Sequence, residues 1–189
     1  MGRWEPDARG RLGAAAMELY SERGYEQTTV AEIAKRAGLT ERTFFRHYAD
    51  KREVLFAGSS ELQDLFVEAV AAAPASATPI DAVSAGLDAV AELFADRREF
   101  ARRRRAVIAA NTELQERELM KLASMTTALA ATLRDRGVPP QAAALTAETG
   151  IAVFRVTFER WSADGEERPM RTLVREVLRE LKSVAQHIG

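Results

Sequence analysis

Apolar residues recur three or four positions apart along almost the whole chain, and this spacing predicts helices. No segment between turn signals alternates apolar and polar residues as a half-buried strand does. An all-α fold with about nine helices is therefore predicted. The expected helices span residues 6–23, 30–38, 41–47, 51–72, 80–95, 99–110, 112–136, 140–163 and 168–187.

Short, well-marked helix ends divide the first fifty residues. Gly24 ends the first predicted helix, and Thr29 with Glu32 three positions later forms a capping box for the second. Thr40 is the expected N-cap of the third helix, and Asp50 that of the fourth. Caps at this spacing predict short helices that are joined by sharp turns.

The two short helices meet at residues 37–39 and follow a longer one, which is the layout of a helix-turn-helix unit. In such a unit the first short helix supports the second, whose exposed side chains enter the major groove of DNA. Cations, hydroxyls and an aromatic ring would face outward here, where they suit phosphates and base edges. A solvated helix pair in any helical bundle has the same layout, so the layout alone leaves both interpretations open.

Residues 24–51, GYEQTTVAEIAKRAGLTERTFFRHYADK, closely resemble the N-terminal DNA-binding region of TetR-family transcriptional regulators. The resemblance has no gaps and covers about the first 57 residues. It implies a homodimeric regulator, usually a repressor, with three N-terminal DNA-binding helices and a larger ligand-binding and dimerisation region. We expect a DNA-binding domain over residues 1–50 and a C-terminal domain over 51–189, connected by helix 51–72.

The resemblance also assigns DNA contacts position by position. Hydroxyls and backbone N–H groups at the start of the second helix are expected to meet a phosphate. The family most often has tyrosine where this chain has Phe45, so only apolar or stacking contact is expected there. Phe44 and Tyr48 are expected to pack inside the unit. The predicted DNA-binding residues are Thr28, Thr29, Arg36, Thr40, Arg42, Thr43, Phe45, Arg46, His47 and Lys51.

The net charge of the chain is −1, which by itself argues mildly against a nucleic-acid partner. Residues 1–57 hold ten Lys and Arg against nine Asp and Glu, a net charge of +1, which leaves −2 for the remainder. Affinity for DNA must therefore come from the placement of cations, which gather after residue 35. We expect modest nonspecific DNA binding that weakens with salt.

The composition argues against enzymes and metal sites. The chain has no cysteine and only two histidines, His47 and His187, so neither a Cys-ligated metal nor a Ser-His-Asp arrangement is expected. Phosphate-binding and dinucleotide-binding glycine motifs are missing as well. We predict no enzyme activity, no cofactor and no membrane span, in a cytoplasmic protein. A helical small-molecule carrier is the remaining alternative, although it would not account for residues 24–51.

The last two predicted helices carry apolar stripes that a monomer would struggle to bury. The resemblance implies that such helices pair between two subunits, and paired recognition helices would bind a palindromic operator. Any one of these side chains could equally pack inside its own subunit. The interface candidates are Leu145, Ile151, Phe154, Leu173, Val177, Leu181 and Val184.

A ligand pocket is expected among the fourth to eighth helices, where large adaptable side chains occur, although such residues are more often core. Four successive arginines, 102–105, point about 100° apart on a helix, so they cannot share one solvent face. They could be solvated or paired with acids such as Glu99 or Glu113, or one could bind an anionic effector such as a fatty acyl or acyl-CoA compound. The pocket candidates are Leu62, Phe66, Phe94, Arg104, Met120, Met125, Phe158 and Trp161.

Overall fold

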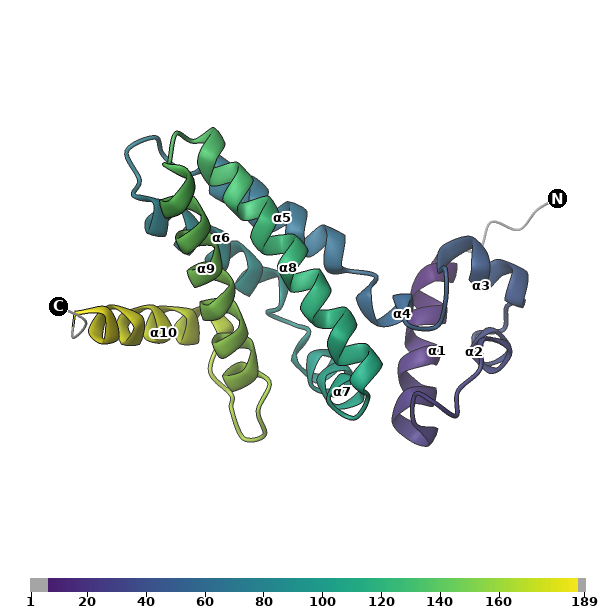
Figure 1. Cartoon of the computed structure of the whole chain (residues 1–189). Coiled ribbons are helices and arrows are strands. Elements are labelled where there is room, and N and C mark those ends of the chain that lie inside the picture. Colours follow the sequence, from purple (N-terminus) through teal and green to yellow (C-terminus); the bar gives the residue numbers. More distant parts are fainter. Residues whose placement is uncertain (1–6, 187–189) are drawn as a thin grey trace. The chain divides into compact units, whose positions relative to one another are not determined.

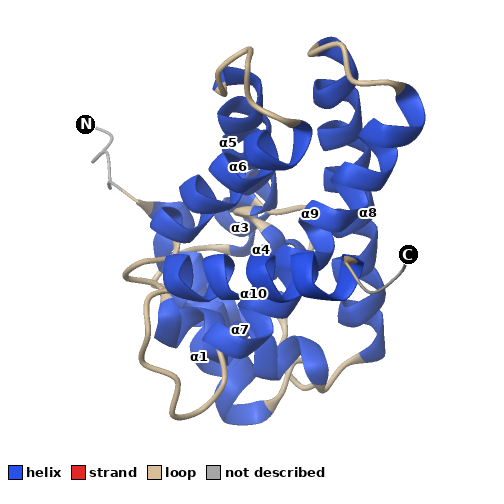
Figure 2. Ribbon diagram, turned by 90° about the vertical axis from the view of Figure 1, so that its left-hand side faces the viewer, coloured by secondary structure: helices blue, strands red, loops and turns tan. Residues whose placement is uncertain are grey.

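The computed structural model describes residues 7–186, and all regular structure in this range is helical (Figures 1 and 2). This confirms the all-α prediction, while the predicted helix ends at Pro6 and His187 lie outside the described residues. The helices of the described range are α1 (Ala8–Arg23), α2 (Val30–Arg36), α3 (Glu41–His47), α4 (Glu53–Phe56), α5 (Ser59–Ala72), α6 (Pro79–Leu93), α7 (Arg98–Ala109), α8 (Thr112–Asp135), α9 (Pro140–Trp161) and α10 (Met170–Ala185).

The predicted helix 51–72 is interrupted, and its range contains both α4 and α5. The interruption lies at Ala57 and Gly58. Side chains from elsewhere take up carbonyl groups near this break: Arg104 donates to Leu55 (2.7 Å) and Arg9 donates to Ala57 (2.9 Å). Apolar residues continue at helical spacing across the break, which is why periodicity alone does not reveal it.

The predicted caps of α2 and α3 are present. The hydroxyl of Thr29 accepts a hydrogen bond from the backbone N–H of Glu32 (3.2 Å), and the Glu32 carboxylate accepts one from the backbone N–H of Thr29 (2.9 Å). At α3 the Thr40 hydroxyl accepts from the backbone N–H of Thr43 (3.2 Å). These bonds satisfy N–H groups that a helix start would otherwise leave without partners.

Two compact units can be distinguished in the described residues. The N-terminal unit comprises residues 7–59 and 103–118, and the C-terminal unit comprises residues 60–102 and 119–186. Helices α7 and α8 contribute residues to both units. The division into functional domains 1–50 and 51–189 stays a prediction.

The core of the N-terminal unit forms where α1 contacts α2, α3 and α4. Its fully buried side chains include Leu12 and Leu19 of α1, Ile33 of α2 and Phe44 of α3. Leu114 of α8 joins the same core. A helix of seven residues such as α3 is too short to be stable in isolation, so these contacts hold it in place.

In the C-terminal unit α9 packs against α6 and α10, and α10 also contacts α6 (Figure 1). Phe66 of α5 is fully buried there, beside Gly86 of α6 and Gly150 of α9. A Cβ atom at Gly86 would overlap the Phe66 ring and lie 2.9 Å from Val70. The glycines therefore permit a close approach of three helices.

We predict that Gly86→Ala destabilises the protein. Alanine has a higher helix propensity than glycine by about 1 kcal/mol, but overlap with the buried Phe66 ring should outweigh this gain. The expected result is a net loss of about 1 to 3 kcal/mol in the free energy of unfolding, measured in urea.

Gly58→Ala is the matched control, because a Cβ at Gly58 would meet no atom within 4 Å. The double variant Gly86→Ala, Phe66→Leu should recover part of the loss, since leucine removes the overlapping ring atoms. Equal stability of the Gly86→Ala and Gly58→Ala proteins would show that the close approach at Gly86 is unimportant.

Candidate nucleic-acid interface

One face of α3 is held in the core of the N-terminal unit. Phe44 is fully buried, Tyr48 directly after the helix is 6% exposed, and the two ring centroids lie 5.5 Å apart. The Tyr48 hydroxyl donates a hydrogen bond to the carbonyl of Arg9 (3.0 Å). These contacts confirm the packing predicted for both rings and turn the opposite face of α3 outward.

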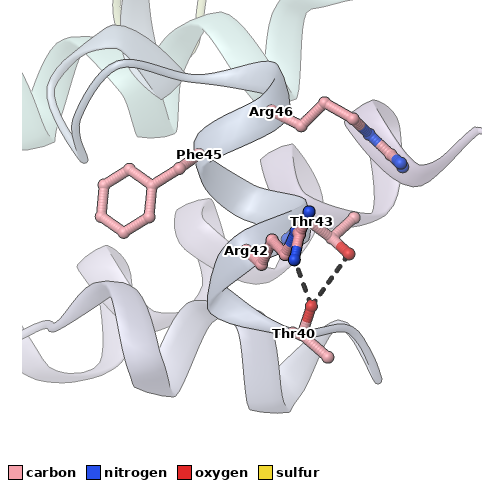
Figure 3. Close-up of a pocket in the computed structure, with 5 residues that line it drawn as sticks. All are labelled: Thr40, Arg42, Thr43, Phe45 and Arg46. Atoms are coloured by element: carbon pink, nitrogen blue, oxygen red, sulfur yellow. Dashed lines mark hydrogen bonds between the residues drawn. The ribbon is translucent and has the colours of Figure 1, made fainter.

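The outward face of α3 carries five side chains around an open depression of about 620 Å³. Figure 3 shows Phe45 and Arg46 projecting in opposite directions from the helix, with Arg42 and Thr43 nearer its start. Phe45 is 56% exposed, although large apolar side chains are usually buried. The depression is lined by Thr40, Arg42, Thr43, Phe45 and Arg46, all predicted DNA contacts.

The guanidinium groups of Arg42 and Arg46 have no ion-pair partner within residues 7–186, and both side chains are exposed. Each can therefore donate to a phosphate oxygen or to the acceptors of a guanine edge. The hydroxyls of Thr40 and Thr43 lie 3.0 Å apart, and the Thr40 hydroxyl also caps the helix. This combination of groups suits the major groove of DNA.

The two threonines predicted to meet a phosphate at α2 are already engaged. Thr28 is 1% exposed, and its hydroxyl donates to the carbonyl of Gly24 (2.9 Å). Its predicted phosphate contact is therefore wrong, because burial prevents access. Thr29 is exposed, but its hydroxyl donates to the Glu32 carboxylate (2.9 Å), which a phosphate would have to displace. The role of Thr29 stays a prediction.

Arg36 is paired with acids of α1. Its guanidinium contacts Glu18 (3.1 Å) and Glu22 (2.9 Å). The hydrogen bond from Arg36 lowers the pKa of the Glu22 carboxyl. A phosphate would have to compete with two carboxylates for this cation, so the predicted DNA contact of Arg36 is disfavoured by its surroundings.

Lys51 has a structural role that the sequence did not reveal. Its ammonium donates to the carbonyls of Tyr25 (2.9 Å), Glu26 (3.3 Å) and Thr28 (3.1 Å), and lies 4.3 Å from the centre of the Tyr25 ring. An ammonium group has three N–H donors. Since these three are used inside the protein, the predicted phosphate contact of Lys51 is corrected to a contact that fixes the segment before α2.

His47, at the end of α3, is half-buried, and its Nε2 atom is buried without a hydrogen-bond partner. Unlike the exposed side chains of Arg42 and Arg46, this nitrogen atom is not accessible to solvent in the free protein. The DNA contact of His47 stays a prediction.

Most of the pocket candidates do come together in the C-terminal unit. Phe66, Met125 and Trp161 are buried in its main hydrophobic cluster, and Leu62, Phe94 and Phe158 pack against that cluster while partly exposed. Two residues were not among the predicted ones: Arg98, whose guanidinium lies 4.9 Å from the centre of the Trp161 ring, and Thr157 of α9, whose buried hydroxyl has no hydrogen-bond partner. Arg98 stands four positions before Arg102, so both lie on one face of a helix, and this spacing could have identified Arg98 from the sequence.

Two pocket candidates lie elsewhere. Met120 is 63% exposed on α8, so its side chain does not line an internal pocket. Arg104 belongs to the N-terminal unit, where it donates to the Leu55 carbonyl, pairs with Glu118 (2.9 Å) and lies 5.0 Å from the centre of the Phe56 ring. Both assignments are corrected, because periodicity does not show which face of a helix meets which neighbour.

The interface candidates separate into buried and exposed residues. Ile151, Phe154, Leu173 and Val177 are at most 7% exposed and belong to the core of their own chain, so their assignment to an interface is wrong. Leu181 is partly buried against the same core. Leu145 on α9 and Val184 on α10 are 70% and 63% exposed, and Val156 on α9, which the sequence analysis did not select, is 46% exposed.

Within residues 7–186, no helix is both long enough and apolar enough to cross a membrane. In the same range, no three side chains of the metal-binding types come together as a ligand set.

A helix-turn-helix with an exposed, arginine-bearing third helix suits a DNA-binding regulator. Residues 12–57 match the family described as "Bacterial regulatory proteins, tetR family", and residues 77–186 match the "MftR C-terminal domain". The second match covers more than half of the chain. The chain therefore belongs to the TetR family of bacterial transcriptional regulators, with a C-terminal domain of the MftR type.

Part of the chain is similar to the HTH-type transcriptional regulator TcmR of Streptomyces glaucescens. The two are 40% identical over 82 residues, which are 43% of this chain and 36% of TcmR. The similarity therefore reaches only about a third of the relative's length.

Solved structures of similar proteins superpose on nearly the whole chain. The Thermus thermophilus transcriptional repressor FadR, in complex with lauroyl-CoA, is 26% identical and superposes with a TM-score of 0.60, covering 92% of this chain and 93% of FadR. The FadR of Bacillus subtilis, in complex with stearoyl-CoA, is 21% identical with a TM-score of 0.63 and covers 91% and 96% of the two chains. These similarities support the TetR fold, and the family consists of transcriptional regulators.

The contacts of Lys51 lead to a prediction. Lys51→Met should lower the free energy of unfolding by about 1 to 3 kcal/mol, because three backbone carbonyls lose their charged donor. Urea unfolding measures this loss. In Arg46→Met, which removes an exposed cation, the stability should change by no more than about 0.5 kcal/mol. Equal stability of the two variants would return Lys51 to the set of available phosphate ligands.

Proposed function

We propose that this TetR-family regulator is a homodimeric repressor that binds a palindromic operator and is released by a small hydrophobic effector. The observation that supports DNA binding best is the outward face of α3, with two exposed arginines that have no ion-pair partner in the described residues. As a regulator acting on bacterial DNA, the protein would work in the cytoplasm. Residues 1–50 would serve as the DNA-binding domain, and residues 51–189 as the effector-binding and dimerisation domain.

The DNA contacts that we propose are centred on α3. Arg42 and Arg46 would reach phosphates or guanine edges, and the hydroxyls of Thr40 and Thr43 would contact phosphates or bases. Phe45 has no hydroxyl, so it would contact a thymine methyl group or a sugar. Its exposure in the free protein is consistent with a surface that becomes buried only on DNA.

Exposed apolar residues on α9 support a dimer. Leu145, Ala152 and Val156 are spaced by seven and four positions, so they lie on one face of α9, and all three are exposed. Val184 of α10 is a further exposed apolar residue. A second copy of the chain, related by two-fold symmetry, would cover such a stripe and present a second α3 to the next major groove.

A fatty acyl or acyl-CoA effector is supported by two of the structural neighbours, which were solved with lauroyl-CoA and stearoyl-CoA. The apolar residues gathered in the C-terminal unit suit such a ligand. Release from DNA requires the effector to bind more tightly to a conformation in which the recognition helices no longer fit successive grooves.

The DNA contacts predict the behaviour of the double variant Arg42→Ala, Thr43→Ala. Its affinity for DNA from upstream of its own gene and neighbouring genes should fall roughly tenfold to a hundredfold in a gel-shift assay, because base-edge or phosphate contacts are lost. Higher salt should weaken binding of the wild-type protein.

Arg97→Ala is the charge control for this assay, since Arg97 is exposed and lies in the C-terminal unit. A double variant that binds as tightly as Arg97→Ala would remove α3 from the interface. Failure of the wild-type protein to bind any of these DNA segments would favour a helical carrier without DNA activity.

The stripe on α9 predicts that Leu145→Glu weakens the dimer. A charge at a side chain that is 70% exposed in the single chain should leave folding intact and raise the dimer dissociation constant at least roughly tenfold. Sedimentation measures the change, and Leu119→Glu on α8, where leucine is 56% exposed, is the control. A monomeric wild-type protein, or equal association of both variants, would contradict the proposed dimer.

A further inference from the structure

Buried polar atoms without a hydrogen-bond partner are rare, and each calls for an explanation. In the described residues these atoms are Nε2 of His47, Nε of Arg102 and Oγ1 of Thr157. The last two belong to the C-terminal unit. Thr157 lies on α9, and Arg102 lies on α7 and donates to a carbonyl just after α9. Both atoms can donate a hydrogen bond, so both would be satisfied by an oxygen-bearing ligand.

The C-terminal unit also holds an aromatic cluster of Phe94, Phe158 and Trp161. The ring centroid of Phe94 lies 5.4 Å from that of Phe158 and 5.8 Å from that of Trp161. Trp161 is buried, whereas Phe94 and Phe158 are partly exposed, so the cluster has an accessible edge. Thr157 precedes Trp161 by four positions and so lies on the same face of α9.

Two arginines of α7 meet the end of α9 next to the cluster. Arg98 lies 4.9 Å from the centre of the Trp161 ring and donates to the carbonyls of Trp161, Glu166 and Arg168. Arg102, one turn later on α7, donates to the carbonyls of Ala163 (2.7 Å) and Glu166 (3.2 Å).

The carboxylates of Glu166 and Glu167 act electrostatically on Arg98 without forming a salt bridge with it. Neither Arg98 nor Arg102 forms a salt bridge within residues 7–186, and the Glu166 carboxylate is bound by Arg168 (2.6 Å). Burial and the neighbouring Arg102 lower the pKa of Arg98, and the carboxylates of Glu166 and Glu167 offset this shift only in part. Carbonyl oxygens carry only partial charges, so an anionic oxygen would form a stronger, charge-assisted hydrogen bond with these guanidinium groups.

We propose that Arg102, supported by Arg98, binds the anionic head of an amphiphilic effector whose apolar chain packs against Phe94 and Phe158. The Thr157 hydroxyl is buried in the free protein but, unlike that of Thr28, has no partner within the chain, and it donates to an oxygen of the same ligand once the ligand has entered. The head is a carboxylate or a phosphate, since both offer anionic oxygens to a guanidinium. This inference rests on the proposed function and specifies where its effector binds.

The first test measures binding through Trp161 fluorescence in the full chain carrying Trp4→Phe, which leaves Trp161 as the one tryptophan. The probes are laurate, lauroyl-CoA and dodecanol, which share the alkyl chain and differ in the head. An anionic probe should bind roughly tenfold more tightly than dodecanol, and Arg102→Gln should abolish this advantage. Arg97→Gln, an exposed arginine just before α7, is the matched control and should keep it.

The second test uses Thr157→Val, which replaces the buried hydroxyl with a methyl group of similar size. Without ligand, this variant should melt about 2 to 4 °C higher, because it no longer buries an unsatisfied hydroxyl. It should nevertheless bind the anionic probe roughly threefold to tenfold more weakly. A side chain with only a structural role would not combine higher stability with weaker binding.

The outcomes separate the sources of the anion. Binding of laurate identifies a carboxylate head, and binding of lauroyl-CoA without laurate identifies a phosphate. The site is refuted if dodecanol binds as tightly as both anions, or if Arg102→Gln binds them as Arg97→Gln does. If lauroyl-CoA releases the wild-type protein and the Arg102→Gln variant from DNA equally well, this site is refuted but the proposed function is preserved. If no anionic probe binds the wild type, the site and the proposed effector class both fail.

Discussion

The burial of Phe44 against α1 and α2 is the interaction on which the proposed DNA-binding surface depends. Helix α3 has only seven residues, so packing rather than intrinsic helix stability decides where it lies. With Phe44 fully buried and Tyr48 nearly so, Arg42, Phe45 and Arg46 have to face solvent. The same contact that stabilises the N-terminal unit therefore presents the groups that suit a major groove.

The positions of the cations, rather than the net charge of +1 over residues 1–57, support the proposed binding to DNA. Several cations of the N-terminal unit serve its own backbone or its own acids: Lys51 binds three carbonyls, Arg36 pairs with Glu18 and Glu22, and Arg104 donates to Leu55. Arg42 and Arg46 remain exposed without ion pairs. The result is a small basic surface around α3, while Lys51, Arg36 and Arg104 contribute to the fold.

Local signals predicted the helices well, because caps and apolar spacing act within a few residues. The Thr29 and Thr40 caps place the starts of α2 and α3 correctly, whereas the carbonyls near the break at Gly58 are bonded by arginines from distant segments. The candidate sites were less predictable, because contacts between distant segments decide which side chains are accessible. Thr28 and Lys51 occupy family contact positions, yet tertiary contacts bury the one and engage the other. On α9, periodicity cannot distinguish the core residue Ile151 from exposed Leu145.

The central claim is that burial of Phe44 turns the outer face of α3 toward DNA, and that two copies of α3 bind together in a dimer. Selection of bound duplexes from a random DNA pool tests this claim most directly. The account predicts enrichment of palindromic sites whose half-sites lie about 10 base pairs, or a multiple of this, apart. It also predicts that the Arg42→Ala, Thr43→Ala variant, with an intact fold, enriches no such sequence. Enrichment of the same palindrome by that variant, or no symmetric site with the wild-type protein, would contradict the account.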